Sequence, residues 1–338
     1  MQQSVFKHKG IFKLESGAHL SDIEIAYCAY GKLNAEKNNV VWVCHALTAN
    51  ADCTDWWSGV VGANKIIDTE KYFVVCANIL GSCYGSTSPK NINPESNEKY
   101  GKRFPLITIR DMVNAHIALR KNLGIEEIKI CMGGSMGGYQ AMEWALMEKN
   151  VIEKLILLCT SARESAWGIA IHTAQRLAIE ADESFYTNTE NAGAKGLKAA
   201  RAIGMLTYRN YAAFAQTQTD DDDTKLDNYK AASYIHHQGD KLVSRFNAHS
   251  YHVLTKAMDS HNIARNRGSI ENVLSTVKNK TLLIGISTDF LCPNAEQVFM
   301  AKHLPNAELK IIESGYGHDG FLIEWLKITE AISDFLEN

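Results

Sequence analysis

Residues 129–144, "KICMGGSMGGYQAMEW", hold a single serine between two pairs of glycines. An apolar stretch precedes the serine and a helix-like stretch follows it. Gly133, Ser135 and Gly137 fit the pattern G-x-S-x-G, which between a strand and a helix predicts a sharp turn that exposes a serine hydroxyl. The start of the helix would add backbone N–H groups and a positive dipole end. The alternative is a glycine-rich turn without a catalytic role, so residues elsewhere in the chain must distinguish the two interpretations.

Two downstream residues have the types and positions that a serine nucleophile requires. Such a serine needs a general base, and the base needs a group that orients it. Asp289 follows the apolar run 281–287, and His318 follows the run 309–314. Both would lie at the carboxyl ends of strands, where open α/β sheets place their ligands. We therefore predict Ser135, Asp289 and His318 as a catalytic triad. The alternatives are a turn or helix-start role for Asp289 and a surface or core role for His318.

Acyl transfer also requires hydrogen-bond donors for the negative charge that develops on the carbonyl oxygen. The first candidate is the backbone N–H of Met136, the residue after the serine. The second is the N–H of Leu47, in the loop that follows the apolar run 40–45. We interpret His45, at the start of this loop, as a structural histidine rather than a second base.

Short apolar runs alternate with helical patterns over most of the chain. Runs that are apolar at nearly every position indicate strands covered on both faces, so we predict an α/β fold with a mostly parallel sheet flanked by helices. Helices are expected at 109–124 and 136–150; in the first, Arg120 interrupts the apolar side. The expected strands are 24–30, 40–45, 72–78, 128–133, 154–160, 281–287 and 309–314.

Residues 165–275 break this alternation, because they contain helix-like stretches and no convincing strand. We predict that they form an all-helical lid inserted between two strands, and that 1–164 and 276–338 form the core domain. The acidic run Asp220–Asp223 is interpreted as a solvated loop. No metal site is predicted, since the histidines of this segment lack a third ligand or a carboxylate pattern. These histidines are His236, His237, His249 and His252.

The composition argues against several functional classes. A formal net charge of −3 favours neither nucleic acid nor an anionic membrane surface as a partner. The N-terminal segment lacks the apolar run of a signal peptide, and no stretch approaches the roughly 18 apolar residues of a membrane span. The eight cysteines include no C-x-x-C pair and are interpreted as buried reduced thiols. We therefore expect a cytoplasmic protein.

With these residues placed, the chain resembles the homoserine O-acetyltransferase family of acyltransferases with the α/β-hydrolase fold. G-x-S-x-G alone would indicate only a superfamily, whereas an ordered set of segments over nearly the whole chain is far more specific. These segments are "HALTANADCTDWW" (45–57), "CANILGSCYGSTSP" (76–89), "FPLITIRDMV" (104–113), "GGSMGGYQAMEW" (133–144), "AARAIGMLTYRN" (199–210), "GDKLVSRFNAHSYHVLTKAMD" (239–259) and "GHDGFL" (317–322).

The resemblance implies a reaction of methionine biosynthesis without a bound cofactor. Ser135 would take an acetyl group from acetyl-CoA, the co-substrate, and L-homoserine would then accept it. His318 would act as base and then acid, oriented by Asp289. The family also places Arg209 on the homoserine carboxylate and Asp319 on its ammonium, which suits these residue types. A surface salt bridge is the alternative for Arg209, and a turn or helix start for Asp319.

The resemblance further suggests a homodimer formed through the helical insertion. Two positions depart from the family: Ala49 stands where glycine is frequent, and "TSP" (87–89) where "TGP" is common. Both would lie near the acyl pocket. Relatives that transfer succinyl or act on serine share most of these motifs, so the acyl group and the acceptor stay open. From the residues alone, a serine esterase is the runner-up. A catalytically dead binding protein would need a missing triad residue.

Overall fold

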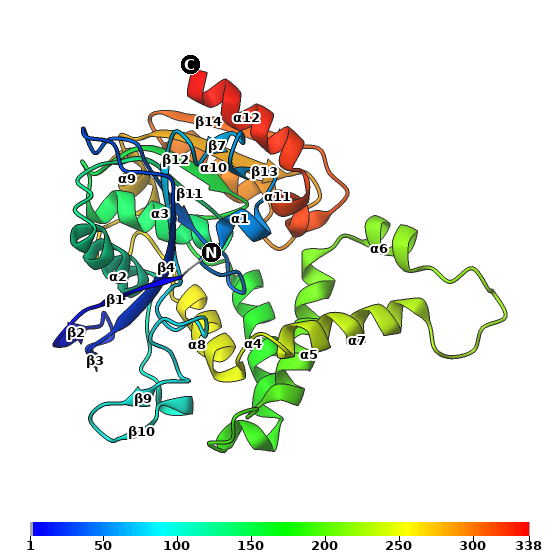
Figure 1. Ribbon diagram of the computed structural model, residues 1–338. Coiled ribbons are helices and arrows are strands. Elements are labelled where there is room, and N and C mark those ends of the chain that lie inside the picture. Colours follow the sequence, from blue (N-terminus) through cyan, green and yellow to red (C-terminus); the bar gives the residue numbers. More distant parts are fainter. Residues whose placement is uncertain (1–2, 338) are drawn as a thin grey trace.

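The computed structural model describes residues 3–337 and has a central sheet covered by helices (Figure 1). β1 pairs antiparallel with β4 and β4 with β8, whereas every later pair of neighbours in the main sheet is parallel. The predicted mostly parallel sheet is therefore confirmed. Within the described residues the main sheet has eight strands, in the spatial order β1 (Ser4–Lys7), β4 (Glu24–Tyr30), β8 (Phe73–Ala77), β5 (Val40–Cys44), β11 (Ile128–Gly134), β12 (Ile152–Leu158), β13 (Lys280–Ile286) and β14 (Ala307–Ile312).

All seven predicted strands form, but two of them begin and end two residues before the predicted bounds. The strand expected at 154–160 is β12, and the strand expected at 309–314 is β14. Cys159 leaves the strand geometry because its φ of 46° lies in the left-handed region. Sequence patterns did not predict β1 or the very short strands of three two-stranded sheets, which lack an apolar run. These are β2 (Ile11–Lys13) with β3 (His19–Ser21), β6 (Val61–Gly62) with β7 (Ile67–Asp68), and β9 (Ile92–Asn93) with β10 (Glu98–Lys99).

The main sheet separates two apolar cores, one on each of its faces. In β5, Trp42 belongs to one core, and Val41 and Val43 belong to the other. Because both faces are covered, every residue of β5 is buried and the strand is apolar throughout. The first core includes α2 (Ile109–Asn122), α3 (Met136–Met147) and α10 (Asn294–His303); the second includes residues of α1 (Cys53–Trp56), α11 (Gly320–Ile323) and α12 (Trp325–Glu337).

Helices α2 and α3 confirm the two predicted helices, although each ends before its predicted bound. α2 begins at a capping box formed by Thr108 and Asp111. Arg120, which interrupts the apolar side of this helix, is nevertheless buried. Its guanidinium lies 2.9 Å from the carboxylate of Glu148 and donates to the carbonyl of Ile125. The charge is therefore paired within the packing.

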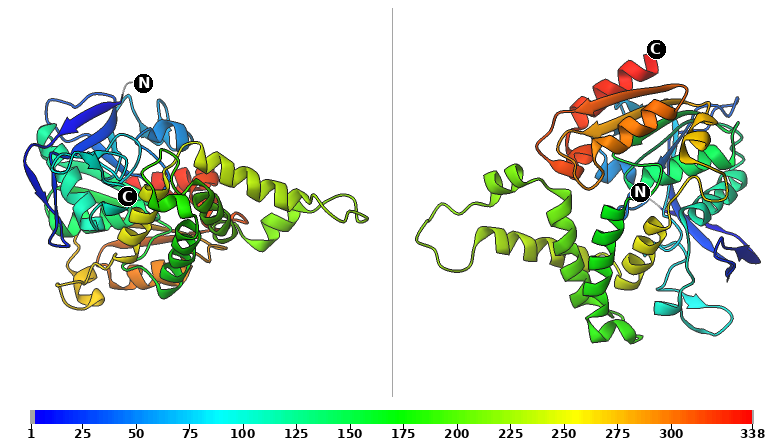
Figure 2. Two further views of the ribbon diagram at one scale, coloured as in Figure 1. Left: turned by 90° about the horizontal axis from the view of Figure 1, so that it is seen from below. Right: turned by 180° about the vertical axis from the view of Figure 1, so that it is seen from behind.

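Between β12 and β13, the described chain contains helices and loops but no strand, as predicted. The only β-type pairing within this part of the described chain is an isolated antiparallel bridge between Arg163 and Asn262. The helices are α4 (Ala166–Glu180), α5 (Ala194–Tyr208), α6 (Tyr211–Gln218), α7 (Lys230–Val243), α8 (Ala248–Asp259) and α9 (Ile270–Ser275). α6, α7 and the loop between them extend away from the sheet as an arm (Figure 1, Figure 2). The division into a core (1–164 and 276–338) and a lid (165–275) stays a prediction.

Local contacts account for Asp220 of the acidic run and for two histidines of the helical segment, His249 and His252. Asp220 pairs with Lys225 and accepts the backbone N–H of Lys230, so it holds a loop together. His249 contacts the carbonyl of Phe185 at 2.8 Å, and His252 contacts Glu180 at the same distance. All eight cysteines are free thiols, and seven of them are buried as expected, whereas Cys83 is partly exposed. None of the helices within residues 3–337 has the length and apolarity required to cross a bilayer.

Candidate active site

Ser135 occupies a strained corner between β11 and α3. Its backbone has φ 55° and ψ −125°, a conformation that residues with a Cβ rarely adopt. The flanking glycines are required by close backbone contacts. A Cβ on Gly137 would lie 2.1 Å from the carbonyl oxygen of Cys44, and a Cβ on Gly133 would lie 2.4 Å from the backbone of Gly137. The turn therefore closes against β5 and presents the serine hydroxyl, which is the sharp turn that the sequence predicts.

Asp289 and His318 form a buried pair at the carboxyl ends of β13 and β14. The Asp289 Oδ1 atom accepts the backbone N–H groups of Leu291 and Cys292, at 3.0 and 2.9 Å. Its Oδ2 atom lies 2.7 Å from His318 Nδ1. Burial disfavours the imidazolium, but the charge and hydrogen bond of Asp289 outweigh it, so the pKa of His318 lies above its usual value. This arrangement suits a general base with a fixed ring orientation.

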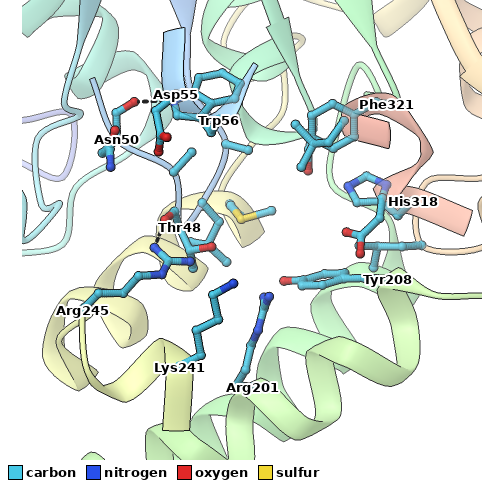
Figure 3. A pocket seen from close by; sticks show the side chains of 18 of the residues that line it. Thr48, Asn50, Asp55, Trp56, Arg201, Tyr208, Lys241, Arg245, His318 and Phe321 are labelled. Atoms are coloured by element: carbon cyan, nitrogen blue, oxygen red, sulfur yellow. Dashed lines mark hydrogen bonds between the residues drawn. The ribbon is translucent and has the colours of Figure 1, made fainter. Parts of the chain in front are cut away.

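Ser135 and His318 line the same cavity, which has a volume of about 440 Å³ (Figure 3). Within residues 3–337, no hydrogen bond joins the Ser135 hydroxyl to the His318 ring, whereas the bond from His318 to Asp289 is formed. Contacts between a nucleophile and its base are often loose without substrate and tighten in the complex. The structure thus brings the three residues of the predicted triad to one site.

The two predicted oxyanion donors are available for a ligand. Leu47 lies in the loop after β5 and lines the cavity, and Met136 is the first residue of α3. Neither backbone N–H donates to an acceptor within the described residues. An unpaired N–H next to the serine and a second one from the loop after β5 are the two donors that an oxyanion hole requires.

His45 holds this loop in place and stays neutral. Its Nδ1 lies 2.8 Å from the carbonyl oxygen of Ala46, and its Nε2 accepts the N–H of Ile79 at 3.1 Å. Nδ1 must therefore carry the proton and donate to that carbonyl. Burial lowers the pKa of His45 to about 4. The interpretation of His45 as a structural loop histidine is confirmed.

Gln140, which sequence reasoning missed, joins the loop to the nucleophile helix. Its buried amide donates to the carbonyl oxygens of His45 and Met136, both at 3.1 Å, and its Oε1 lies 3.1 Å from His116 Nε2. The amide therefore fixes the spacing between the loop that carries Leu47 and the start of α3. No sequence signal identifies it, since its partners come from three separate elements.

Arg209 and Asp319 contact each other in this structure. Arg209 Nε lies 3.0 Å from Asp319 Oδ2. Asp319 lines the cavity next to His318, whereas Arg209 lines a neighbouring hollow of about 550 Å³ beside α6. Burial raises the pKa of Asp319, although the cation of Arg209 opposes that effect. The predicted acceptor residues are thus adjacent, but paired with each other.

Three further features concern the site: Ala49, Ser88 and a cluster that contains the Cys159 thiol. Ala49 lines the cavity, whereas Ser88 is not among its lining residues and forms a turn with Asn91. Cys159, Asp289 and His318 have possible metal ligand atoms within 4.8 Å of one another. Burial raises the pKa of the Cys159 thiol, which keeps it protonated. Asp289 and His318 are already hydrogen-bonded to each other. We therefore assign no metal to this cluster.

Comparison with known proteins agrees with the fold. Residues 39–324 match the family model of the alpha/beta hydrolase fold. The strand order, the strained serine corner and this match define an α/β-hydrolase-fold protein. The homoserine O-acetyltransferase of Cyclobacterium marinum is 44% identical over 100% of this chain and 96% of the relative. That of Trichormus variabilis is 41% identical over 100% and 95%. The chain belongs to the homoserine O-acetyltransferase family, as its segments indicated.

Solved structures show the same fold in more than one kind of enzyme. The homoserine O-acetyltransferase from Bacillus anthracis has a TM-score of 0.91 and 26% identity, covering 100% of this chain and 98% of that one. Esterase E22 has a TM-score of 0.90 at 24% identity and covers 99% of both chains, which shows the fold alone. The fold by itself therefore does not separate acyl transfer to an alcohol from ester hydrolysis.

Proposed function

We propose that this chain is a homoserine O-acetyltransferase, which moves an acetyl group from acetyl-CoA to the side-chain hydroxyl of L-homoserine. The observation that carries the proposal is one cavity lined by a strained serine and by a histidine paired with a buried aspartate. Membership of the homoserine O-acetyltransferase family supports acetyl-CoA as the donor and L-homoserine as the acceptor. The product would enter methionine biosynthesis.

In the first half-reaction, His318 Nε2 takes the proton of Ser135 as its Oγ attacks the thioester carbonyl. The N–H groups of Leu47 and Met136 bind the oxygen that becomes negative. When the tetrahedral intermediate collapses, the carbon–sulfur bond breaks and His318 returns the proton to the CoA sulfur. The result is an acetyl-serine and free CoA. Asp289 keeps the proton on Nδ1 and stabilises the imidazolium between these steps.

In the second half-reaction, the hydroxyl of L-homoserine attacks the acetyl-serine and His318 takes its proton. The ester of homoserine forms, and Ser135 recovers its hydrogen from His318. Arg209 and Asp319 would hold the acceptor by its carboxylate and ammonium, each exchanging its present partner for a group of the substrate. The 3.0 Å contact between them supports this role, because it holds the Arg209 guanidinium next to Asp319, which lines the cavity.

We propose a homodimer formed through the arm. Large apolar side chains are exposed there: Tyr211 is 89% and Leu226 is 91% exposed. The hollow beside α6 is lined by Tyr211 together with Phe214 and Phe290. Contiguous exposed apolar surface is typical of a protein interface. We also propose a cytoplasmic location, since eight free thiols suit a reducing compartment.

A serine esterase and a succinyl donor are the competing functions. Esterase E22 shares the fold, and a hydrolase would follow the same steps with water in place of homoserine. Ala49 lines the cavity at a position where the family often has glycine. Its methyl group therefore affects which size of acyl group the cavity accepts. The succinyl alternative changes the donor of the first half-reaction, and the esterase changes the acceptor of the second, but both proceed through an acyl-serine.

The test is release of CoA thiol from acetyl-CoA, measured with and without L-homoserine. We expect homoserine to accelerate release strongly, and both succinyl-CoA and L-serine to be poor replacements. Release that is unaffected by homoserine, together with cleavage of simple esters, would identify an esterase. A preference for succinyl-CoA would correct the donor while leaving the transferase mechanism intact.

A further inference from the structure

Three cationic side chains line one wall of the cavity that contains Ser135. Arg201 comes from α5, Lys241 from the last turn of α7, and Arg245 follows α7. Figure 3 shows Arg201 and Lys241 side by side with their charged ends directed into the cavity, and Arg245 beside them. All three belong to the segment between β12 and β13, so this wall is separate from the strands that carry the triad.

None of these three cations forms an ion pair with any residue that the structure describes. Arg245 donates to neutral acceptors, the carbonyl of Thr48 at 2.6 Å and the hydroxyl of Tyr84. Arg201 lies over the ring of Tyr208, with its guanidinium carbon 5.3 Å from the ring centre. The buried Nε of Arg201 has no hydrogen-bond partner.

The carboxylates of the cavity do not fully neutralise this wall. The charge of Asp319 attracts Arg201, but its ion pair is with Arg209, at 3.0 Å. Asp55 lies on the opposite wall, next to Trp56 and Asn50 (Figure 3). Three like charges that converge beside one already paired carboxylate repel one another, and a partly buried guanidinium without a hydrogen-bond acceptor is costly. Such an arrangement is typical of a site that binds an anion.

We infer that Arg201, Lys241 and Arg245 form the subsite for the phosphate groups of the acyl-CoA donor. This inference rests on the proposed function. A multiply charged phosphate ester matches three cations better than the acceptor does, because homoserine carries a single carboxylate and its own ammonium. Guanidinium groups fork onto phosphate oxygens, and a lysine adds a point charge.

The remainder of the cavity suits the uncharged arm of the same donor. Apolar side chains line much of it, among them Leu47, Trp56, Met258 and Phe321. An extended thioester could therefore keep its acyl end at Ser135 while its anionic end contacts the helical wall. Arg245 also donates to the carbonyl of Thr48, in the loop that carries the proposed oxyanion donor Leu47. A phosphate bound by Arg245 would therefore lie next to this loop.

The test compares two donors that differ in their phosphates, acetyl-CoA and S-acetyl-N-acetylcysteamine, at saturating L-homoserine. We expect Lys241→Met and Arg201→Gln each to lower kcat/KM for acetyl-CoA about tenfold, the value of one charge-assisted contact. The kcat/KM for the short thioester and the KM for L-homoserine should stay within about twofold. Lys241→Arg should recover most of the loss. Lys195→Met, an exposed position on α5, is the matched control and should change nothing.

Calorimetry of CoA binding gives a second readout that does not depend on turnover. The affinity of the wild type for CoA should fall as salt rises, and Lys241→Met should weaken both the affinity and its salt dependence. Equal losses for the two donors, unchanged CoA affinity, or a rise confined to the KM for homoserine would each overturn the inference. A wild type that binds CoA in this way, but is not stimulated by homoserine, would instead contradict the proposed function.

Discussion

Asp289 Oδ2 and His318 Nδ1 lie 2.7 Å apart, and both residues are buried at the carboxyl edge of the sheet. This contact fixes the tautomer of His318 and leaves Nε2 free to act as the base. It also determines how the activity depends on pH. His318 must be neutral to accept a proton, so kcat/KM for acetyl-CoA should rise as the pH increases through the pKa of His318.

Asp289→Asn should therefore have two effects. Removal of the negative charge lowers the pKa of His318, because that charge is what raises it, and the rising limb of the pH profile should move to lower pH. The maximal kcat should fall by about 10⁴, since the amide favours the wrong tautomer. A pH–rate profile of the variant checks both effects. A limb that stays in place would mean that another group controls the titration.

Gln140→Leu should lower kcat while leaving both KM values nearly unchanged. The amide links the carbonyls of His45 and Met136, and without it the two proposed oxyanion donors lose their fixed spacing. We expect a loss of about tenfold to a hundredfold, the range for a weakened oxyanion contact.

The matched control for this prediction is Gln175→Leu, because Gln175 is a buried amide that does not line the cavity. Both variants should lose some thermal stability, but the control should keep the wild-type kcat. Equal losses of kcat in the two variants would assign Gln140 a purely structural role.

Arg209→Ala should impair use of the acceptor and spare the first half-reaction. Asp319 would lose its present partner, and the carboxylate of homoserine would lose its proposed one. We expect the KM for L-homoserine to rise about tenfold or more, the value of a charge-assisted pair. Stopped-flow release of CoA in the absence of acceptor should be unchanged. A selective loss of that burst would contradict the assignment.

Leu226→Ser combined with Tyr211→Ser should shift the protein from dimer to monomer. Both side chains are almost fully exposed on the arm, so their replacement should not disturb the core. Sedimentation velocity would measure the change, and Leu326→Ser, at an exposed site on α12, is the control. A wild type that sediments as a monomer at micromolar concentration would contradict the proposed interface.

The sequence identified those parts of the site that have a local signature. Ser135 is recognisable because the turn demands glycine at fixed offsets, and Asp289 and His318 because each follows an apolar run near the end of the chain. The fold class followed from strands such as β5, which must be apolar on both faces. Each of these inferences depends on a pattern within about fifteen residues.

The remaining features depend on contacts between distant segments. Gln140 gains its role from a loop carbonyl and from His116, and neither is visible from its own neighbours. Arg201 and Lys241 lie on different helices, α5 and α7, and meet only in the folded chain. The short edge strands, such as β1, are exposed at most positions and therefore lack the apolar pattern that marks a strand.

The most direct test of the account is mass spectrometry of the protein mixed with acetyl-CoA in the absence of acceptor. We predict the mass increment of one acetyl group, located on the peptide that contains Ser135, removed on addition of L-homoserine and absent from Ser135→Ala. An unmodified Ser135, in an enzyme that nevertheless turns over acetyl-CoA and homoserine, would contradict the acyl-serine mechanism.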